Sequence, residues 1–284
     1  MKVPISFLIP VRNEEKNLPR CLESISWADE ILVVDSQSTD RTVEIAEQHG
    51  ARVVQFHFNG TWPKKRNWTL DNVPIRHEWV FILDADETLP PGAEEELRTL
   101  VSGNGRFDAY WVNRRFMFLG RWLNHAYYPN WILRFFKHRK ARYAKLTDAV
   151  MNSTDNEVHE PMEVDGPAGR MRSEIAHYAF PTIESFVERH NLYSNWEAHV
   201  ELNDTGGEGL KNMSLRQKLK RWSRRLPCRP FLRFLFVYVW QRGFLDGREG
   251  YYFARLHGIY EFLSVAKAYE LKKRMAETAN RERH

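Results

Sequence analysis

The sequence predicts an α/β fold, in which a mostly parallel sheet carries helices on both faces. Two observations lead to this prediction. Short apolar segments alternate with segments of helical periodicity over the first hundred residues, which is the order of βαβ units. Polar and acidic clusters follow the apolar segments, where the carboxyl ends of parallel strands form a ligand crevice. The 284 residues, 43% of them hydrophobic, are enough for one large domain or for one domain with a substantial extension.

The elements of the first hundred residues each have a local signal. Helical spacing of apolar residues predicts a helix at 13–26, with Asn13 as its N-cap. The next helix begins at Thr39 or Asp40 and stops near Gly50. The other elements predicted here are strand 5–10, strand 30–35, strand 52–56, helix 64–72 and strand 79–83.

The pattern changes after residue 108, where aromatic residues become frequent. The elements expected in this part are strand 108–118, aromatic loop 120–129, strand 131–136, a loop-rich stretch at 142–169 and helix 183–202. A polar, glycine-rich break at 203–209 then marks a domain boundary. We therefore predict a first domain at 1–202 and a helical extension at 210–284.

The extension differs in composition from the first domain. Eight basic residues and no acid lie between 211 and 229, and an apolar, aromatic stretch follows at 230–240. Such a stretch is too short to span a bilayer but suits an interfacial segment at an anionic membrane surface. A solvated basic helix packed on the domain is the alternative.

The composition indicates a globular protein of a reducing compartment. Two cysteines, Cys21 and Cys228, are too few for a disulfide framework. We expect no signal peptide, because the apolar segment 5–9 is too short for one. We expect no membrane-spanning helix, because no run of about 18 apolar residues occurs. The formal net charge is +5.

The segment 80–87 carries the clearest chemical signal. Its apolar run ends in three acids, Asp84, Asp86 and Glu87. Two carboxylates one residue apart at the carboxyl end of a strand suit Mg²⁺ or Mn²⁺, which keeps open positions that a substrate diphosphate can fill. An acidic turn before a helix N-terminus is the alternative explanation.

Three polar clusters, at 10–14, 35–40 and 84–86, follow strands and would share one rim of a parallel sheet. Asp35 can accept hydrogen bonds from a base or a ribose hydroxyl, and Arg12 can pair with phosphate or stack on a base. The chain contains no glycine-rich phosphate loop. A nucleotide would therefore bind here through acids and a metal.

These clusters give the chain a clear resemblance to glycosyltransferase family 2, the inverting group with the GT-A fold. The motifs that carry the resemblance are Ser6-Phe-Leu-Ile-Pro-Val-Arg-Asn-Glu14, Leu32-Val-Val-Asp-Ser-Gln-Ser-Thr-Asp40 and Leu83-Asp-Ala-Asp-Glu87. Through Val158-His-Glu160 and His177-Tyr178 the chain most resembles the branch that includes lipopolysaccharide core glucosyltransferases. The shared pattern covers residues 3–195.

The resemblance implies a donor pocket in the first two clusters. Pro10, Arg12 and Glu14 would line the pocket for the base and the ribose. Asp35 would hold the base, with Ser36 beside it. The donor is expected to be a nucleotide sugar, with UDP as its nucleotide.

The resemblance also implies a metal site in the third cluster. Asp84 would face the ribose or the sugar and lie at the metal. Asp86 would ligate Mg²⁺ or Mn²⁺ on the diphosphate. His177 would be a further metal ligand or a donor to the diphosphate, while a structural histidine is the alternative. His159 would lie behind the site.

The resemblance places the catalytic base at Glu160. An inverting transfer needs a carboxylate that takes the proton of the acceptor hydroxyl, and such help is worth about 10²–10⁴ in rate. Glu157 is the main rival, followed by Asp148 and Asp155. On a strand Glu157 and Glu160 would face opposite sides, so only one of them would reach the cleft.

Two further groups have a structural explanation as well as a functional one. Lys64, Arg66 and Asn67 would lie near the donor, or at an exposed helix start. An acceptor platform could use aromatic faces that stack on sugars, or the same residues could fill the core. The residues of this platform are Trp122, Tyr127, Tyr128 and Trp131.

The expected function is transfer of a single sugar to a lipid-linked or lipopolysaccharide-like glycan at the inner face of the cytoplasmic membrane. Polymer synthesis is disfavoured because no Gln-x-x-Arg-Trp sequence is present. A basic protein that binds nucleic acid or anionic lipid is the alternative from another class. The acidic rim would repel nucleic acid, so we expect no such partner. A sugar nucleotidyltransferase is disfavoured because Val11-Arg-Asn-Glu-Glu15 is not a glycine-rich loop.

Overall fold

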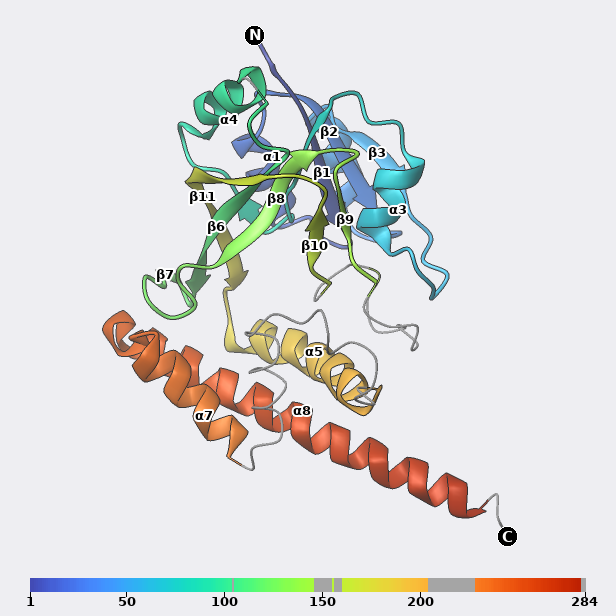
Figure 1. Ribbon diagram of the computed structural model, residues 1–284, viewed down its shortest axis with the longest axis vertical. Helices are drawn as coiled ribbons and strands as arrows, with labels where there is room; N and C mark the ends of the chain where they lie inside the picture. The colour runs from blue at the N-terminus through green and yellow to red at the C-terminus, as the bar shows by residue number, and fades with distance from the viewer. Residues whose placement is uncertain (104, 146–154, 156–159, 204–227, 282–284) are drawn as a thin grey trace. The chain divides into compact units, whose positions relative to one another are not determined.

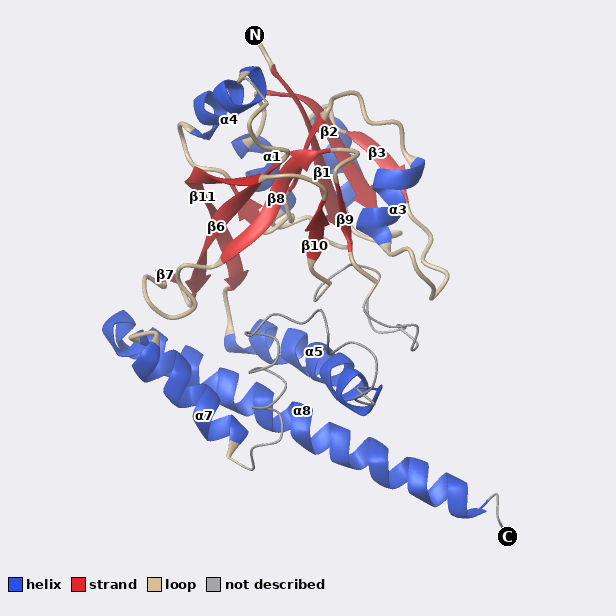
Figure 2. Cartoon of the chain, in the orientation of Figure 1, coloured by secondary structure: helices blue, strands red, loops and turns tan. Residues whose placement is uncertain are grey.

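The computed structural model describes residues 1–281 apart from 104, 146–154, 156–159 and 204–227 (Figure 1). The chain forms two compact units. Unit 1 comprises Met1–Met117 and Pro129–Ala179, and unit 2 comprises Phe118–Tyr128 and Phe180–His284. Most strands belong to unit 1, whereas the C-terminal part is helical (Figure 2).

The N-terminal half of the sheet is parallel, with the strand order β3-β2-β1-β4. Its strands are β1 (Val3–Val11), β2 (Ala28–Asp35), β3 (Arg52–Gln55) and β4 (Trp79–Ile82). The helices between them are α1 (Leu18–Ser24), α2 (Thr42–Gln48) and α3 (Lys65–Asn72). In register, Val11 pairs with Asp35 and Leu8 with Ile82, so the strands end at one edge.

Antiparallel strands continue the sheet beyond β4, in the order β8-β6-β11-β5. Their bounds are β5 (Glu87–Thr88), β6 (Ala109–Phe118), β8 (Trp131–Lys137) and β11 (Ala168–Phe180). The helix α4 (Ala93–Ser102) follows β5, and β9 (Ala141–Tyr143) pairs with β10 (Met162–Val164) in a separate small sheet. The predicted α/β class is confirmed.

The core of unit 1 consists of two clusters, one on each face of the sheet. Successive side chains of β1 point alternately into the two clusters, because side chains alternate along a strand. Phe7 packs in a cluster with Leu18 of α1 and Leu97 of α4. Leu8 packs in the opposite cluster with Leu70 of α3. Helices therefore cover both faces, as predicted.

The first two helices begin later than predicted. α1 begins at Leu18, because Asn13 has a φ of 56° and its side-chain oxygen accepts the backbone N–H of Thr39 at 2.8 Å. α2 begins at Thr42, whose backbone N–H donates to Asp40 at 3.0 Å. The polar residues that resemble N-caps instead shape the loops at the strand ends, since Asn and Asp bond readily to nearby backbone.

The sequence pattern does not predict β11. The strand begins at Ala168 inside the stretch expected to be loop-rich, which also contains β10. The inward residues of β11 include the bulky Met171 and Ile175, but also Gly169, His177 and Ala179. The inward side is therefore apolar only in part, which weakens the alternation that makes a half-buried strand visible.

In its described residues, unit 2 contains helices and the short β7 (Arg121–Trp122). The described helices are α5 (Ile183–Asn203), α7 (Arg229–Leu235), the π-helix η2 (Phe236–Trp240), the 3₁₀-helix η3 (Gly243–Asp246) and α8 (Gly247–Arg281). α5 packs on α8 and so lies in unit 2, whereas the predicted first domain extends to residue 202. In the part of the chain that the structure describes, no helix combines the length and the apolar character needed to cross a membrane.

Candidate active site

The loops after β1 and β2, which carry the predicted nucleotide pocket, are joined by hydrogen bonds. The backbone N–H of Asn13 donates to Ser38 Oγ, and that of Glu14 donates to Thr42 Oγ1, both at 2.8 Å. Pro10 is buried beneath them and Arg12 is exposed. The two predicted donor-binding clusters thus form one connected wall.

Asp35 is buried in this wall, and its own loop holds its carboxylate. The carboxylate accepts the backbone N–H of Ser38 at 3.0 Å and the side-chain amide of Gln55 at 2.9 Å. An ionised carboxylate has about four acceptor positions. The role of Asp35 in holding a base is compatible with these contacts and stays a prediction.

Three consecutive cations at the start of α3 bind carboxylates from three different segments. The pairs are Lys64 Nζ to Glu160 Oε1 at 2.8 Å, Lys65 Nζ to Asp155 Oδ2 at 2.9 Å, and Arg66 to Asp84. All three cations are buried, and so is Asn67, whose amide bonds to the backbone of Tyr143. The alternative of an exposed helix start is therefore wrong.

Lys65 lies at the centre of this arrangement, with its side chain fully buried. Its ammonium also donates to the Val11 carbonyl at 2.8 Å, and Asp155 accepts the hydroxyl of Ser36. Burial lowers the pKa of Lys65 by more than Asp155 raises it. Burial acts to raise the pKa of Asp155, but Lys65 and Ser36 hold it below its ordinary value. The network ties the ends of β1 and β2 to Asp155.

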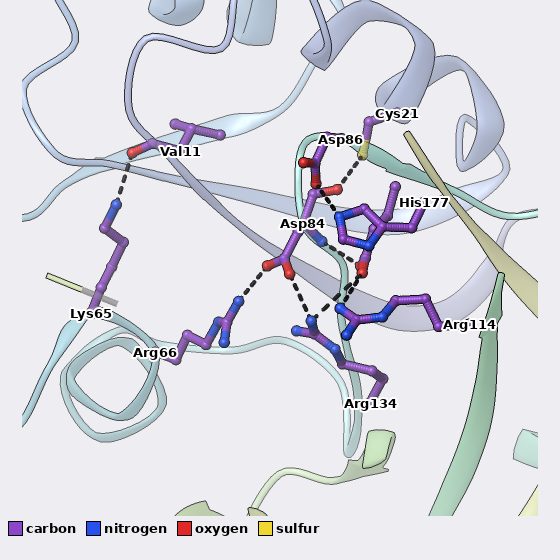
Figure 3. A network of polar contacts seen from close by, with 10 residues as sticks. Val11, Cys21, Lys65, Arg66, Asp84, Asp86, Arg114, Arg134 and His177 are labelled. Carbon is purple, nitrogen blue, oxygen red and sulfur yellow. Dashed lines mark hydrogen bonds and ion pairs between the residues drawn. The ribbon is translucent and has the colours of Figure 1, made fainter. Parts of the chain in front are cut away.

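Asp84 is bound by two arginines, one at each carboxylate oxygen (Figure 3). One oxygen pairs with Arg66, and the other lies 2.6 Å from Arg134 Nη2. Burial acts to raise the pKa of Asp84, but Arg134 and Arg66 outweigh it and hold this pKa far below its ordinary value. Both oxygens of Asp84 are thus engaged by cations, and its role at the metal stays a prediction.

Glu87 lies beneath Asp84 and is completely buried. It accepts the backbone N–H of Asp84 at 3.0 Å, and its other oxygen lies 3.3 Å from Arg114 Nη1. Cys21 approaches the same turn, with its Sγ 3.6 Å from the Asp84 carbonyl. Burial, followed by the charge of Glu87, raises the pKa of the Cys21 thiol well above its ordinary value.

Asp86 and His177 are brought together by the pairing of β5 with β11. His177 is the partner of Glu87 in this ladder, and the backbone N–H of Tyr178 donates to the Asp86 carbonyl at 2.9 Å. Nε2 of His177 then lies 3.3 Å from Asp86 Oδ1, as Figure 3 shows. Both side chains are largely buried. The structure therefore joins two residues that are 91 positions apart and that we predicted for one metal site.

The Asp86–His177 pair fits two ligands of one divalent cation. Ligands about 2.1 Å from a metal on adjacent corners lie about 3 Å apart, close to the observed separation. Among the described residues no group of three or more His, Cys, Asp or Glu side chains could hold a metal ion. Such a two-ligand site suits Mg²⁺ or Mn²⁺, which takes its other ligands from water and substrate phosphates.

Glu160, the predicted base, is buried and oriented by Lys64. An ion pair between two groups that are each less than 5% exposed fixes the carboxylate in place. Glu157 and Asp148 lie outside the described residues, as does His159. Asp155 is described, but Lys65 and Ser36 engage it. Both described candidates are thus paired with a lysine, and the assignment of the base to Glu160 stays a prediction.

Three site residues were not predicted, namely Lys65, Arg114 and Arg134. Lys65 is hidden in a run of basic residues, which usually indicates a solvated helix face. Arg134 interrupts an apolar strand. A charged residue in a buried strand indicates that an oppositely charged side chain pairs with it. Arg114, in β6, has a weaker signal of the same kind.

The predicted aromatic platform is divided between the units. Trp131 belongs to unit 1, while Trp122, Tyr127 and Tyr128 belong to unit 2. Tyr127 stacks on His257 with ring centroids 4.5 Å apart, and its hydroxyl accepts a hydrogen bond from Arg233. For Tyr127 the structure therefore supports packing inside unit 2.

The sequence matches the family described as "Glycosyl transferase family 2" over residues 6–154, which contain both donor-pocket clusters, α3 and the acidic turn. Since this match spans more than half of the chain, the chain belongs to glycosyltransferase family 2. It is a transferase enzyme, and the predicted resemblance is confirmed.

Curated relatives match along almost the whole chain. An uncharacterized glycosyltransferase of Rickettsia typhi is 27% identical over 273 residues, which are 94% of this chain and 87% of the relative. LpsC of Rhizobium meliloti, a lipopolysaccharide core biosynthesis glycosyltransferase, is 26% identical over 287 residues, or 95% and 93% of the two chains. This similarity confirms the predicted resemblance to the lipopolysaccharide core branch.

Solved structures match less closely. Residues 1–349 of Staphylococcus aureus TarS in complex with UDP are 17% identical to this chain, with a TM-score of 0.43. The match covers 96% of this chain and 92% of that one. A TM-score of this size supports no conclusion about function.

Proposed function

We propose that this glycosyltransferase is metal-dependent and inverting, and that it moves one sugar from a nucleoside-diphosphate donor to a hydroxyl of a lipid-linked or lipopolysaccharide-like glycan. UDP is the expected nucleotide, and the inner face of the cytoplasmic membrane is the expected place. The proposed binding of the nucleotide donor and of the metal ion is supported by the buried Asp86–His177 pair at the carboxyl edge of the sheet. The name of LpsC supports the acceptor class.

The donor diphosphate would lie against Asp86 and His177, with the base and ribose at the wall formed by Arg12, Glu14 and Asp35. When bound there, a divalent cation would neutralise the charge that grows on the leaving diphosphate. Arg66 and Arg134 keep Asp84 ionised and oriented at the edge of this site.

Glu160 would act as the general base. Its carboxylate takes the proton of the acceptor hydroxyl while the hydroxyl oxygen bonds to the anomeric carbon. The bond from that carbon to the diphosphate oxygen breaks on the opposite face, so the configuration inverts and the nucleoside diphosphate leaves with the bonding electrons. Lys64 holds the carboxylate in position for this step.

Calorimetric titration tests the donor and metal part. UDP, GDP, dTDP and ADP are titrated in turn into the protein with Mn²⁺ and with EDTA, and again into Asp86→Ala. We expect one nucleotide to bind with Mn²⁺ only, and Asp86→Ala to abolish this binding. Asp165→Ala, which removes a carboxylate that is 88% exposed, is the matched control and should bind normally. Binding of equal strength in EDTA would contradict the proposal.

A further inference from the structure

Unit 2 presents a dense group of exposed apolar side chains where the chain turns from η2 into η3. We call residues 236–245 the apolar tip. Its exposed apolar members are Phe236, Val239, Trp240, Phe244 and Leu245. Trp240 is 80% exposed, and Phe244 and Leu245 are each about half exposed. Single exposed apolar residues are ordinary, but a contiguous group of this kind marks an interaction site.

The tip is held rigidly, so its exposure is built into the fold. Asp246, which is buried directly after the tip, accepts the backbone N–H groups of Asn124, His125 and Ala126 at 2.7–3.0 Å. A Cβ atom on Gly250 would lie 1.9 Å from the Gly243 carbonyl, so the first turn of α8 touches the tip. α7 and α8, which precede and follow the tip in the chain, lie side by side (Figure 1).

The charges around the tip are positive. Arg242 and Arg248 are exposed, whereas Asp246 is 1% exposed and fully engaged by backbone. The next acid, Glu249, pairs with Arg121 at 3.4 Å. Exposed arginines beside a group of aromatic residues match the anionic headgroups and the apolar boundary of a bilayer.

We infer that the apolar tip inserts into the interfacial layer of an anionic phospholipid bilayer and anchors the protein there. This inference rests on the membrane partner of the proposed function, and it narrows the expected contact from the basic and apolar stretches at 211–240 to residues 236–245. Trp and Phe side chains are suited to the headgroup level. Arg242 and Arg248 then contact lipid phosphates.

A second copy of the chain is the competing occupant of exposed apolar surface in unit 2. The outer side of α8 carries exposed apolar residues at helical spacing, among them Ile259, Phe262 and Tyr269. Basic residues on both copies would face each other across a tip-to-tip contact, whereas they attract an anionic surface. The charge of the tip therefore favours the bilayer.

Vesicle flotation of the full chain tests the inference, with phosphatidylglycerol and phosphatidylethanolamine in the vesicles. Trp240→Ser combined with Phe244→Ser should weaken binding about tenfold or more, since two large apolar side chains are no longer buried. Phe262→Ser combined with Tyr269→Ser is the matched control on α8 and should bind like the wild type. Circular dichroism and nucleotide titration, which the tip variant should leave unchanged, separate this result from a failure of the proposed function.

Two further readouts make the test decisive. Quenching of tryptophan fluorescence by brominated lipids should fall in Trp240→Phe, because Trp240 lies at the level of the headgroups. Equal flotation of the tip variant and the wild type would overturn the inference. So would light scattering that shows a dimer without vesicles and a monomer for the tip variant.

Discussion

Glu160 offers the most direct test of the chemistry at the level of one side chain. Glu160→Gln keeps the shape of the side chain but removes the proton acceptor. We expect the rate of sugar transfer to fall by about 10²–10⁴, with nucleotide binding unchanged. The measurement is kcat together with calorimetric affinity. Glu163→Gln, at an exposed position of β10, should behave like the wild type. Full activity of Glu160→Gln would assign the base to another carboxylate.

Asp155 gives a prediction about stability and pH. Its pKa lies below the ordinary value, so its contribution is present above a pH of about 4 and is lost as the pH falls through the folded pKa. At pH 7, Asp155→Asn should lower the free energy of unfolding by about 3 kcal/mol, because Lys65 stays buried without its carboxylate.

Urea denaturation at pH 7, 5 and 3 measures this difference. The gap between wild type and Asp155→Asn should be smaller at pH 3 than at pH 7, because the stabilisation by Asp155 declines once the pH lies below the ordinary pKa of an aspartate. Asp165→Asn serves as the control and should follow the wild type at every pH. A gap that does not change with pH would show that the ion pair does not stabilise the fold.

At the level of elements, the contact between η3 and α8 decides whether a Gly-to-Ala substitution in α8 stabilises or destabilises the protein. Ala is favoured over Gly in helices by about 1 kcal/mol, so Gly250→Ala would normally stabilise α8. Here the new Cβ atom would collide with the Gly243 carbonyl. We therefore expect Gly250→Ala to lower the free energy of unfolding by about 2 kcal/mol or more, as measured by thermal or urea denaturation.

Ala266→Gly provides the comparison for this prediction, because Ala266 is exposed on the same helix. It should cost about 1 kcal/mol from helix propensity alone. If Gly250→Ala stabilises the protein, the close approach of the two elements is not maintained in solution.

The elements that could be predicted from sequence are those whose signal is local. β1, β2 and β4 have apolar runs at 7–11, 31–34 and 79–83, and the polar residues that follow these runs lead directly to Asp35 and Asp86. β11 could not be predicted, because small and polar residues such as Gly169 and His177 interrupt the apolar residues of its inward side. The roles of Lys65 and Arg134 depend on partners distant in sequence, and only folding brings Asp155 and Asp84 to them.

For the molecule as a whole, the proposed donor site consists of residues of unit 1, and this gives a spatial prediction. UDP, added with Mn²⁺ at about 100 times the Kd of UDP, should raise the free energy of unfolding of the region that binds it by about 2.7 kcal/mol. Hydrogen exchange should therefore slow in peptides that contain Ser36, Lys65 and Asp86. Peptides from residues 270–281 of α8 serve as the internal control. Slowing confined to α8 would place the donor elsewhere.

The two cysteines of the chain differ sharply in reactivity. Cys21 is buried against the acidic turn with a raised pKa, whereas Cys228 is exposed. A thiol attacks as its thiolate, so a maleimide should react at Cys228 alone. The natural chain can therefore carry one fluorophore at the start of α7, close in sequence to the apolar tip, without any engineered cysteine. Mass spectrometry of the intact protein should show the added mass of one label. This single labelling site would then allow the protein to be followed on a vesicle.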